Sequence, residues 1–533
     1  MADKQPHFIV IMTDQHRADY LGCYGHPFIK TPAIDSLAAR GTKFTRFYVS
    51  SPVCMPNRAS FMTGRMPSVC GARGNGIPLS LQSNTFVELL RSNGYKTSLI
   101  GKSHLMNIVP APGLWQHETP DGLSPAPDEL SEADKFWAPD DLYDQENPKK
   151  WAENDDWKID LPFYGFDQVK LCIGHGDQVM GDYTRWLSNQ GINRENVIGP
   201  ENALEADVEC PQAWRTALSE EHYPSSYIKE QSLAALNEYS KGKGDDPFFM
   251  MVSFPDPHHP FTPPGKYWDM YSPDQVELPK SFYNWPSNSS FAVQQAQKTK
   301  DADWYNENAT NTFLPVNENQ AKEAAALTCG MITMIDDVIG SLLKRLEDSG
   351  LKENTVIVFT SDHGEFLGDY GLLLKGPLHV NSVTNVPFIY ADPTEKSVPE
   401  CDAISGTMDI SSTILARAGL AGFNGMQGRS LLPEIQTGKD QGRGARIIEE
   451  EMQYDVFDMK TPIRLRTLIT DDWRLSIYED DIAEMYDLKN DPDEINNLWG
   501  EPDYIETQAD LLTRMTRELI HYTDLSPAPR RRA

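Results

Sequence analysis

The stretch Thr355-Val-Ile-Val-Phe-Thr-Ser-Asp-His-Gly364 runs from continuous apolar residues directly into polar and ionisable ones. The same pattern occurs at residues 8–15 (FIVIMTDQ), 95–104 (YKTSLIGKSH) and 248–260 (FFMMVSFPDPHHP). Apolar runs of this length are typical of parallel strands that helices cover on both faces. We therefore predict four buried strands: Phe8 to Met12, Tyr95 to Ile100, Phe248 to Phe254 and Thr355 to Thr360.

Helical patterns separate these strands. Apolar residues recur at three- and four-residue steps in Ile34 to Arg40, Phe86 to Asn93 and Ala321 to Asp348. Alternating strands and helices predict an α/β fold with a large, mostly parallel sheet flanked by helices. In such sheets ligands bind beyond the carboxyl ends of the strands, which is where this chain places its Asp, Lys and His residues.

The chain divides into a large first part and a small second part. We predict a catalytic α/β domain over residues 1–440, with insertions near 107–165 and 264–320 that are rich in Pro and aromatic residues. Short β-like runs over 441–505 predict a small α+β subdomain with an antiparallel sheet. Residues 506–533 are expected to form a helix and a tail.

The composition excludes several classes of protein. Of 533 residues, 39% are hydrophobic and 24% charged, which is inside the globular range. With 48 Lys+Arg against 78 Asp+Glu, the net charge of −30 disfavours nucleic-acid binding. Seven scattered cysteines argue against a disulfide framework. Neither a secretory signal nor a membrane span is evident, so we expect a cytoplasmic protein.

The sharpest local motif is SPVCMPNRASFMTGR, at residues 51–65. Pro56 suits the first turn of a helix, so Cys54 is expected at or near a helix N-terminus, where backbone N–H groups favour an anion. Arg58 follows Cys54 by one helical turn and can face the same site. The alternative is an inert buried cysteine followed by a surface arginine.

Oxygen ligands gather at the ends of two predicted strands. Asp14 and Gln15 follow the first strand, and Asp362 and His363 follow the last one. Parallel neighbours would bring these side chains together beside Cys54, and three or more oxygen ligands suit a hard divalent cation. The alternative for each carboxylate is an ordinary helix N-cap.

Cationic and proton-transfer groups follow the same strands. Lys102, His104, His258 and Lys375 could surround a doubly oxygenated anion, although each alone could equally be a surface lysine or a core histidine. Asn75, in the turn GARGNGIP, is either a further substrate contact or ordinary turn chemistry. We regard His16, His259 and His379 as weaker candidates.

Together these motifs resemble the formylglycine-dependent sulfatases of the alkaline phosphatase superfamily. The resemblance covers roughly residues 8 to 500 and includes the later stretches LKGPLH (374–379) and MYDLKNDPDEINNL (485–498). It implies an alkaline-phosphatase-like fold and a Cys54 that a formylglycine-generating enzyme oxidises to formylglycine. It also implies a divalent metal held by Asp14, Gln15, Cys54, Asp362 and His363. We expect a homo-oligomer, either a dimer or a tetramer.

The resemblance also implies a mechanism of sulfate ester hydrolysis. Formylglycine is hydrated to a geminal diol, and one of its hydroxyls attacks the sulfur while the alcohol leaves. The second hydroxyl then loses its proton, the aldehyde re-forms and sulfate departs, so that one hard step becomes two easier ones. Lys102 and Lys375 would stabilise the anion, and His258, with Lys375, would protonate the leaving oxygen. His104 and Arg58 would orient and deprotonate the diol. Asn75, Lys102, His258 and Lys375 would bind the substrate.

Two departures from the family pattern leave alternatives open. Many sulfatases have Asp-Asp where this chain has Asp14-Gln15, and Asp-Asn where it has Asp362-His363. Both pairs resemble the branch of phosphonate monoester hydrolases and related bacterial arylsulfatases. We rank sulfate monoesters first, and phosphonate monoesters and phosphodiesters second. Calcium is the first choice of metal, with manganese credible because of His363. If Cys54 stays a thiol, the protein is a thiol enzyme or a non-catalytic anion-binding protein.

Overall fold

The structure is a computed structural model, and it describes residues 5–109, 124, 127, 141–241, 246–286, 288–291, 293–294, 313–452 and 463–526. Its strands are β1 (His7–Thr13), β2 (Thr42–Phe44), β3 (Phe47–Tyr48), β4 (Lys96–Gly101), β5 (Gln168–Ile173), β6 (Met180–Gly181), β7 (Phe248–Ser253), β8 (Leu314–Pro315), β9 (Thr355–Ser361), β10 (Leu372–Leu373), β11 (Phe388–Ala391), β12 (Glu400–Cys401), β13 (Ser405–Gly406), β14 (Ala445–Met452), β15 (Ile463–Thr470), β16 (Trp473–Tyr478) and β17 (Glu484–Asp487). Its helices are α1 (Pro32–Arg40), α2 (Cys54–Thr63), α3 (Pro67–Cys70), α4 (Phe86–Ser92), α5 (Pro148–Glu153), α6 (Asp182–Asn189), α7 (Pro224–Lys241), α9 (Glu318–Asp348), α10 (Asn381–Thr384), α11 (Thr407–Arg417), α12 (Leu432–Thr437) and α13 (Ile505–His521).

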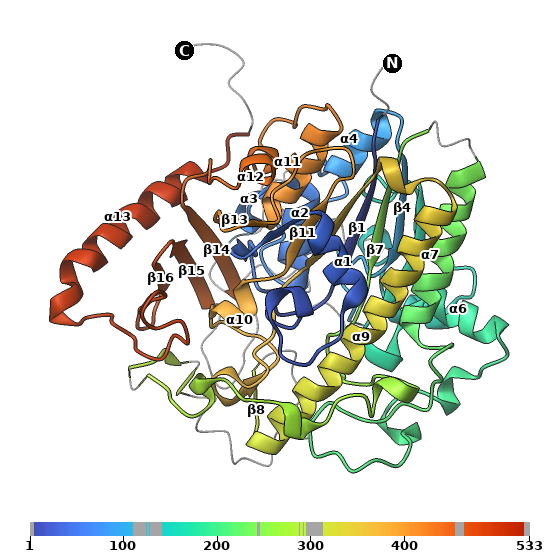
Figure 1. Cartoon of the computed structure of the whole chain (residues 1–533), viewed down its shortest axis with the longest axis horizontal. Coiled ribbons are helices and arrows are strands. Elements are labelled where there is room, and N and C mark those ends of the chain that lie inside the picture. The colour runs from blue at the N-terminus through green and yellow to red at the C-terminus, as the bar shows by residue number, and fades with distance from the viewer. Residues whose placement is uncertain are drawn as a thin grey trace.

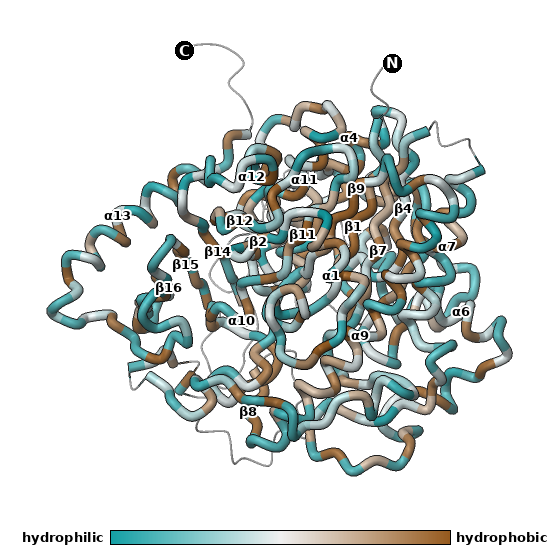
Figure 2. Tube along the Cα trace, in the orientation of Figure 1, coloured by the Kyte–Doolittle hydropathy of each residue, from teal (hydrophilic) through white to brown (hydrophobic). Residues whose placement is uncertain are grey.

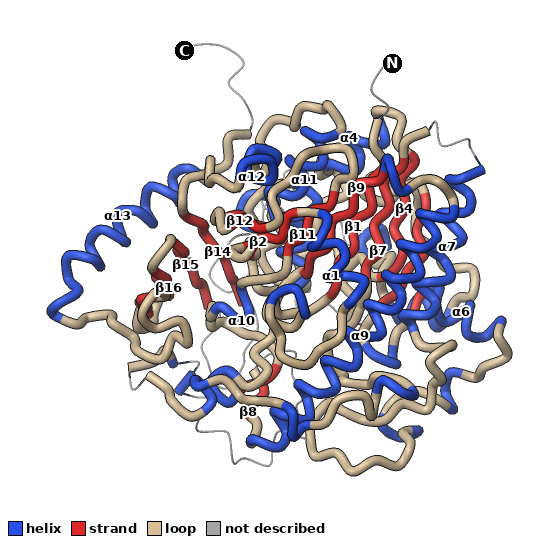
Figure 3. Tube along the Cα trace, in the orientation of Figure 1, coloured by secondary structure: helices blue, strands red, loops and turns tan. Residues whose placement is uncertain are grey.

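A nine-stranded sheet forms the centre of the molecule, with the strand order β12-β2-β11-β9-β1-β7-β4-β5-β6. The four predicted strands are the adjacent members β9, β1, β7 and β4, and all three contacts between them are parallel. Antiparallel pairing occurs where β11 meets β9 and β2, and where β6 meets β5. The predicted α/β class with a mostly parallel sheet is confirmed. Figure 3 shows the strands of this sheet side by side among the helices.

Alternate side chains of β1 enter two different hydrophobic cores. Ile9 and Ile11 belong to the core shared with α1, α7 and α9, while Phe8, Val10 and Met12 belong to the core shared with α2, α4 and α11. Because successive residues of a strand point to opposite faces, one continuous apolar run fills both cores. Figures 1 and 2 show the apolar strands enclosed between helices.

The predicted helices are present as α1, α4 and α9. Helix α9 begins three residues before the expected Ala321, because Asn317 and Gln320 form a capping box that satisfies the first backbone N–H groups. Of the helices that the structure describes, α9 is the one long and apolar enough to cross a membrane, and most of its apolar stretch is buried inside the fold.

The smaller predicted sheet is also present. Strands β14, β15, β16 and β17 form an antiparallel four-stranded sheet within residues 441–505, and α13 packs against it (Figure 1). The two expected insertions are described only in part. Residues 141–165 contain α5, and residues 264–286 contain three short 3₁₀ turns. Most of 110–140 and 295–312 lies outside the described residues.

A glycine joins β4 to the polar residues that follow it. Gly101 has a φ of +107°, and a Cβ atom there would lie 1.8 Å from the carbonyl oxygen of Ser253 on β7. We expect Gly101→Ala to lower the free energy of unfolding by about 2–4 kcal/mol, because it adds a backbone clash to an unfavourable φ. Urea denaturation measures the difference.

Gly94→Ala is the matched control for this variant. Gly94 has a φ of +90°, but a Cβ atom there would have no neighbour within 4 Å. Gly94→Ala should lower the free energy of unfolding by only about 1–2 kcal/mol, the cost of backbone strain at this φ. Equal losses in the two variants would show that the close approach to Ser253 has no energetic weight.

Candidate functional site

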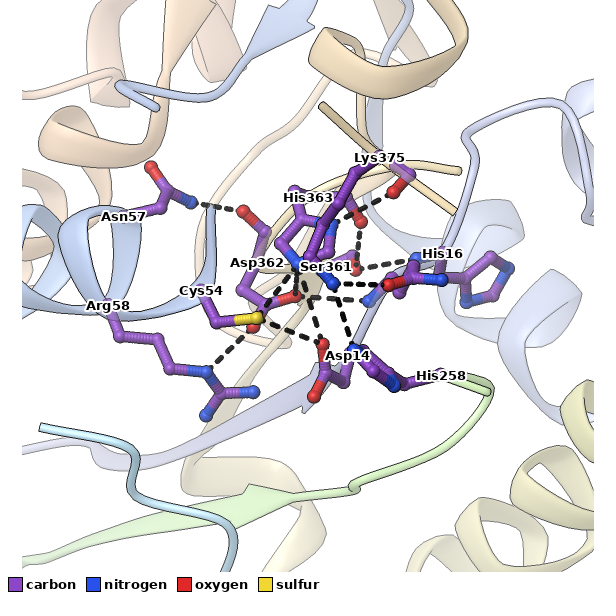
Figure 4. Close-up of polar contacts among 12 residues, drawn as sticks. Asp14, His16, Cys54, Asn57, Arg58, His258, Ser361, Asp362, His363 and Lys375 are labelled. Atoms are coloured by element: carbon purple, nitrogen blue, oxygen red, sulfur yellow. Dashed lines mark hydrogen bonds and ion pairs between the residues drawn. The ribbon is translucent and has the colours of Figure 1, made fainter. Parts of the chain in front are cut away.

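The polar residues that follow the four central strands meet at one edge of the sheet, beside the first turn of α2 (Figure 4). The carboxyl ends of parallel strands share an edge, so residues far apart in sequence become neighbours. The site residues named from the sequence that lie in this cluster are Asp14, Gln15, Cys54, Arg58, Lys102, His104, His258, Asp362, His363 and Lys375.

Cys54 is the first residue of α2, as the sequence predicts. Its Sγ lies 3.0 Å from Nε2 of His363 and 3.8 Å from Oδ1 of Asp14. Burial, together with the nearby Asp14 carboxylate, raises the pKa of the Cys54 thiol to about 12. The unmodified side chain is therefore a neutral thiol at pH 7, and a poor nucleophile in that form.

Arg58 is buried, so the alternative of a surface arginine is wrong. Its Nε donates to Oδ2 of Asp362 at 2.7 Å. Its Nη1 donates to the carbonyl oxygen of Lys102 at 3.1 Å and to Oγ of Ser253 at 3.0 Å. One turn of α2 is thus fixed to the ends of β9, β4 and β7. Nη2 has no hydrogen-bond partner among the described residues, and it can still donate to a bound group.

Four side chains in the cluster suit a metal ion. Ligand atoms of Asp14, Cys54, Asp362 and His363 all lie within 4.8 Å of one another, and all four residues are buried. Nδ1 of His363 lies 2.9 Å from the carbonyl oxygen of Gly364. A carbonyl oxygen only accepts, so Nδ1 carries the proton and the lone pair of Nε2 faces the carboxylates. Two carboxylates and a neutral imidazole fit a divalent cation.

Lys102 and His175 flank the other oxygen of Asp14. Nζ of Lys102 donates to Oδ2 of Asp14 and lies 2.6 Å from Nε2 of His175. Burial opposes ionisation of Asp14, but Lys102, His258 and His175 outweigh it and hold the pKa of this carboxyl well below its usual range. Asp14 is therefore an ionised carboxylate inside the protein.

Lys375 and His258 form a second cationic pair. Nζ of Lys375 lies 2.9 Å from Nε2 of His258 and 2.6 Å from Oε1 of Gln15. Nδ1 of His258 lies 2.5 Å from the carbonyl oxygen of His259. Because an ammonium group only donates, Nε2 of His258 accepts, and its ring proton is on Nδ1. Burial, followed by His175 and His259, lowers the pKa of His258, which agrees with a neutral ring.

His104 and Asn75 lie at the rim of the cluster. The backbone N–H of His104 donates to Oε2 of Glu146 at 2.8 Å, and its buried Nδ1 has no hydrogen-bond partner among the described residues. Burial, and then Lys102, lowers the pKa of His104. Oδ1 of Asn75 accepts from the backbone N–H of Met55 at 3.1 Å. Asn75 therefore caps the start of α2 next to Cys54.

The weaker histidine candidates differ in position. His16 points away from the cluster, toward Tyr20, and His379 bonds to Glu450 at 3.0 Å (Figure 4 shows His16). Nδ1 of His259 lies 3.3 Å from Nε2 of Gln15, at the edge of the site. Of the three, only His259 is near the reacting groups.

Comparison with known families agrees with this geometry. The model of the family described as "Sulfatase" matches residues 6–420, about three quarters of the chain. The chain belongs to the sulfatase family. A second family model, described as "N-sulphoglucosamine sulphohydrolase, C-terminal", matches residues 368–521 of this sulfatase. The family and the class of enzyme predicted from the sequence, a sulfuric ester hydrolase of the alkaline phosphatase superfamily, are thereby confirmed.

Two relatives of the sulfatase are distant but match over nearly their full length. An arylsulfatase of Clostridium perfringens is 26% identical over 97% of this chain and 94% of its own. A multifunctional alkaline phosphatase superfamily protein, PehA of Trinickia caryophylli, is 27% identical over 96% of both chains. The phosphonate monoester hydrolase of Agrobacterium radiobacter has a similar structure, with a TM-score of 0.74, 22% identity and coverage of 98% and 97%. This last likeness supports the alkaline-phosphatase-like fold.

Sequence reasoning missed His175, a residue of the sulfatase's cluster. Its ring stacks on that of His258, with centroids 3.6 Å apart and an interplanar angle of 11°. Burial, and then Lys102, lowers the pKa of His175 to about 3. A signal was present, since His175 follows β5 as the other site residues follow their strands. The run Leu171-Cys172-Ile173 is short, however, and the strand was not predicted.

Glu365 was also missed, although it stands two residues after His363. Its carboxylate accepts from Nε2 of Gln15 and from the backbone N–H of Leu374, which precedes Lys375. The Lys375 ammonium only donates, so the Gln15 amide has one orientation, with Oε1 toward Lys375 and its NH2 group toward Glu365. Burial raises the pKa of Glu365 to about 7, although Lys375 opposes the shift.

We expect Glu365→Gln to lower kcat/KM of the sulfatase about 10- to 100-fold, the usual effect of removing an outer partner of site residues. The new amide cannot accept from both Gln15 and Leu374, so the Gln15 amide and Lys375 lose their fixed positions. Steady-state kinetics measures the loss in kcat/KM. Elemental mass spectrometry shows whether the metal content of the variant changes as well.

Glu434→Gln is the control for a buried glutamate outside the site. Glu434 lies on α12 and pairs with Arg429. Its variant should keep kcat/KM while losing some stability. If both variants were as active as the wild type, Glu365 would have no positioning role.

Proposed function

We propose that this sulfatase hydrolyses sulfate monoesters at Cys54. The observation that carries the proposal is the position of two buried lysines, Lys102 and Lys375, each hydrogen-bonded to a histidine in the cluster that contains Cys54. A sulfate monoester carries one negative charge, which two fixed cations and a helix N-terminus can hold. A phosphate monoester carries nearly two, and suits a site with buried carboxylates less well.

Position 54 is proposed to carry formylglycine, made from Cys54 by a formylglycine-generating enzyme. The spacing Cys54-x-Pro56-x-Arg58 at the start of α2 supports this proposal. The first turn of a helix presents free backbone N–H groups to the reacting anion. Arg58, which is fixed by Asp362, would orient the nucleophile, and the neutral ring of His104 would accept its proton.

Protonation of the leaving oxygen is assigned to the pair of Lys375 and His258. Because an ammonium group only donates, Nζ of Lys375 is the donor and Nε2 of His258 is the acceptor of their hydrogen bond. A substrate oxygen at this point would therefore receive its proton from Lys375, with His258 as the group that holds Lys375 in place. Lys102 would neutralise the opposite side of the sulfate group. Asn75, which accepts from the backbone N–H of Met55 next to position 54, is proposed to contact the bound substrate.

A divalent metal is proposed to bind Asp14, Asp362, His363 and the side chain at position 54, with Oε1 of Gln15 as a further ligand. When bound, it would lower the pKa of the nucleophile and neutralise charge on the transferred group. Oε1 of Gln15 accepts from Lys375, and Glu365 holds the other end of the amide. Calcium is the first choice for a mostly oxygen ligand set, and His363 favours manganese as the second.

Phosphonate monoester or phosphodiester hydrolysis is the second candidate. Gln15 and His363 support it, because the sequence pairs that contain them resemble the phosphonate monoester hydrolase branch. These esters also carry a single negative charge, so a site for one can admit the others. The homo-oligomeric state and the cytoplasmic location stay predictions.

The decisive measurement compares sulfate, phosphonate and phosphate esters that share the same leaving group. We expect kcat/KM for 4-nitrophenyl sulfate to exceed that for 4-nitrophenyl phenylphosphonate and bis(4-nitrophenyl) phosphate by about tenfold or more, or ~1.4 kcal/mol in activation free energy. Cys54→Ala should lower turnover of each ester by at least about a thousandfold. A preference for the phosphonate would reverse the ranking of the two candidate functions.

Mass spectrometry of the peptide that contains Cys54 separates a formylglycine enzyme from the two alternatives, a thiol enzyme and a non-catalytic anion-binding protein. Formylglycine replaces the –CH2SH group by an aldehyde and cannot be alkylated by a thiol reagent. Full alkylation of an active preparation from the native host would contradict the proposed nucleophile.

Metal removal provides the second test of the proposed chemistry. We expect a chelator to abolish turnover and added Ca²⁺ to restore it more fully than Mn²⁺. Asp362→Asn should lower metal content and kcat/KM together, by about a hundredfold or more, because it weakens both the metal ligand and the partner of Arg58. Asp392→Asn, at a buried aspartate that pairs with Arg417 outside the site, should retain both. Normal turnover by metal-free enzyme would exclude the metal role.

A further inference from the structure

A cavity of about 590 Å³ opens beside the reacting groups, on the side of His175 and His259. The ring of His175 stacks on His258, and it also lines this cavity. The cavity therefore lies next to the stacked histidine pair that contacts both lysines, Lys102 through His175 and Lys375 through His258. If sulfate binds among Lys102, Lys375 and position 54, the alcohol part of the ester extends toward this space.

The walls of the cavity are apolar on one side and positively charged on another. Ile108, Ile173, Met180 and Ile198 provide the apolar surface. Arg194 and Lys149 contribute two positive charges, and the described residues that line the cavity include neither Asp nor Glu. In a chain with a net charge of −30, this composition departs from the average surface, and it favours an anion.

Arg194 is held in place and retains unused donors. Its Nη2 donates to the carbonyl oxygen of Gln178 at 3.0 Å, and its side chain is 17% exposed. Its Nη1 lies 3.4 Å from Oε1 of Glu195, a side chain that is 79% exposed, so that ion pair is weak. The buried Nε has no hydrogen-bond partner among the described residues. Its guanidinium can therefore bind a second anionic group.

Lys149 lies on α5 at the outer part of the lining. Its Nζ is 3.8 Å from Oε1 of Glu153, and both side chains are more than 60% exposed, so it is a weaker anion ligand than Arg194. An exposed ammonium adds attraction at the rim, whereas an anchored guanidinium can form two parallel hydrogen bonds to a carboxylate or sulfate.

We propose that this cavity binds the alcohol part of the substrate, and that this part is a ring carrying a second negative group which Arg194 recognises. The ring packs on the isoleucines and Met180, while a carboxylate or a second sulfate meets Arg194. The inference rests on the proposed function, since it assigns the substrate class of the same site. The proposed function names the bond that is cleaved, whereas this inference names the alcohol that leaves.

The test uses two aryl sulfates that differ in one charge, 4-(carboxymethyl)phenyl sulfate and its neutral carboxamide. The full-length metal-loaded enzyme is expected to favour the carboxylate by about tenfold or more in kcat/KM, as a charge-assisted hydrogen bond predicts. Arg194→Gln should bring this ratio to about one, and Lys149→Gln should lower it less. A 4-(sulfomethyl)phenyl sulfate shows whether a sulfonate replaces the carboxylate.

Arg215→Gln is the matched control. Arg215 pairs with Asp269 at 2.7 Å and does not line the cavity, so this variant loses the same charge and should keep the wild-type ratio. A wild-type ratio near one, or equal losses on both esters in Arg194→Gln, would overturn the proposal. If a variant fails to fold, the ratio of kcat/KM values for the wild-type enzyme by itself tests the proposal.

Binding of the product alcohols separates this proposal from the proposed function. Calorimetry with 4-hydroxyphenylacetate and 4-hydroxyphenylacetamide needs no turnover, and the acid should bind about tenfold more tightly. If sulfate esters were not cleaved but the acid bound more tightly, the proposed function would fail and the cavity assignment would stand. Equal binding of acid and amide would refute the cavity assignment, whatever ester the enzyme cleaves.

Discussion

The buried ion pair between Arg58 and Asp362 is the contact on which the site depends. It fixes the first turn of α2 to the end of β9 at an N–O distance of 2.7 Å, and further bonds of Arg58 reach the ends of β4 and β7. Removing one partner of such a pair leaves an uncompensated charge inside the protein, a loss of about 3–5 kcal/mol. The position of Cys54 relative to Asp14 and His363 is therefore set by charge neutralisation as much as by apolar packing.

The matching of hydrogen-bond donors to acceptors assigns the protons in the rest of the cluster. Lysine ammonium groups can only donate, and carboxylates and carbonyl oxygens can only accept, so His258, His363 and the Gln15 amide each have one orientation that satisfies their neighbours. The outcome is a carboxylate-rich half around Asp14 and Asp362, suited to a cation, and a cationic half suited to an anion. A metal ion would bind in the carboxylate-rich half, and a sulfate ester would bind in the cationic half.

The sequence could predict the parts of this arrangement that follow from local pattern. The four central strands, the start of α2 at Cys54 and the clustering of polar residues at the strand ends all derive from apolar runs and the Cys54 motif. His175 and Glu365 could not be assigned in this way, since the ring stacking on His258 and the bond to Gln15 join residues 83 and 350 positions apart. Their chemistry depends on partners that only the folded chain brings near.

Selection among different sulfate esters has to come from the alcohol side. The anion-binding half holds a singly charged tetrahedral group, a property that sulfate monoesters, phosphonate monoesters and phosphodiesters share, so it discriminates weakly among them. Groups that line the cavity beyond His175 would contact only the part of the substrate that differs between esters. Because binding energy from remote parts of a substrate can be used to orient the reacting bond, a fixed cation such as Arg194 would select a substrate and also raise its turnover.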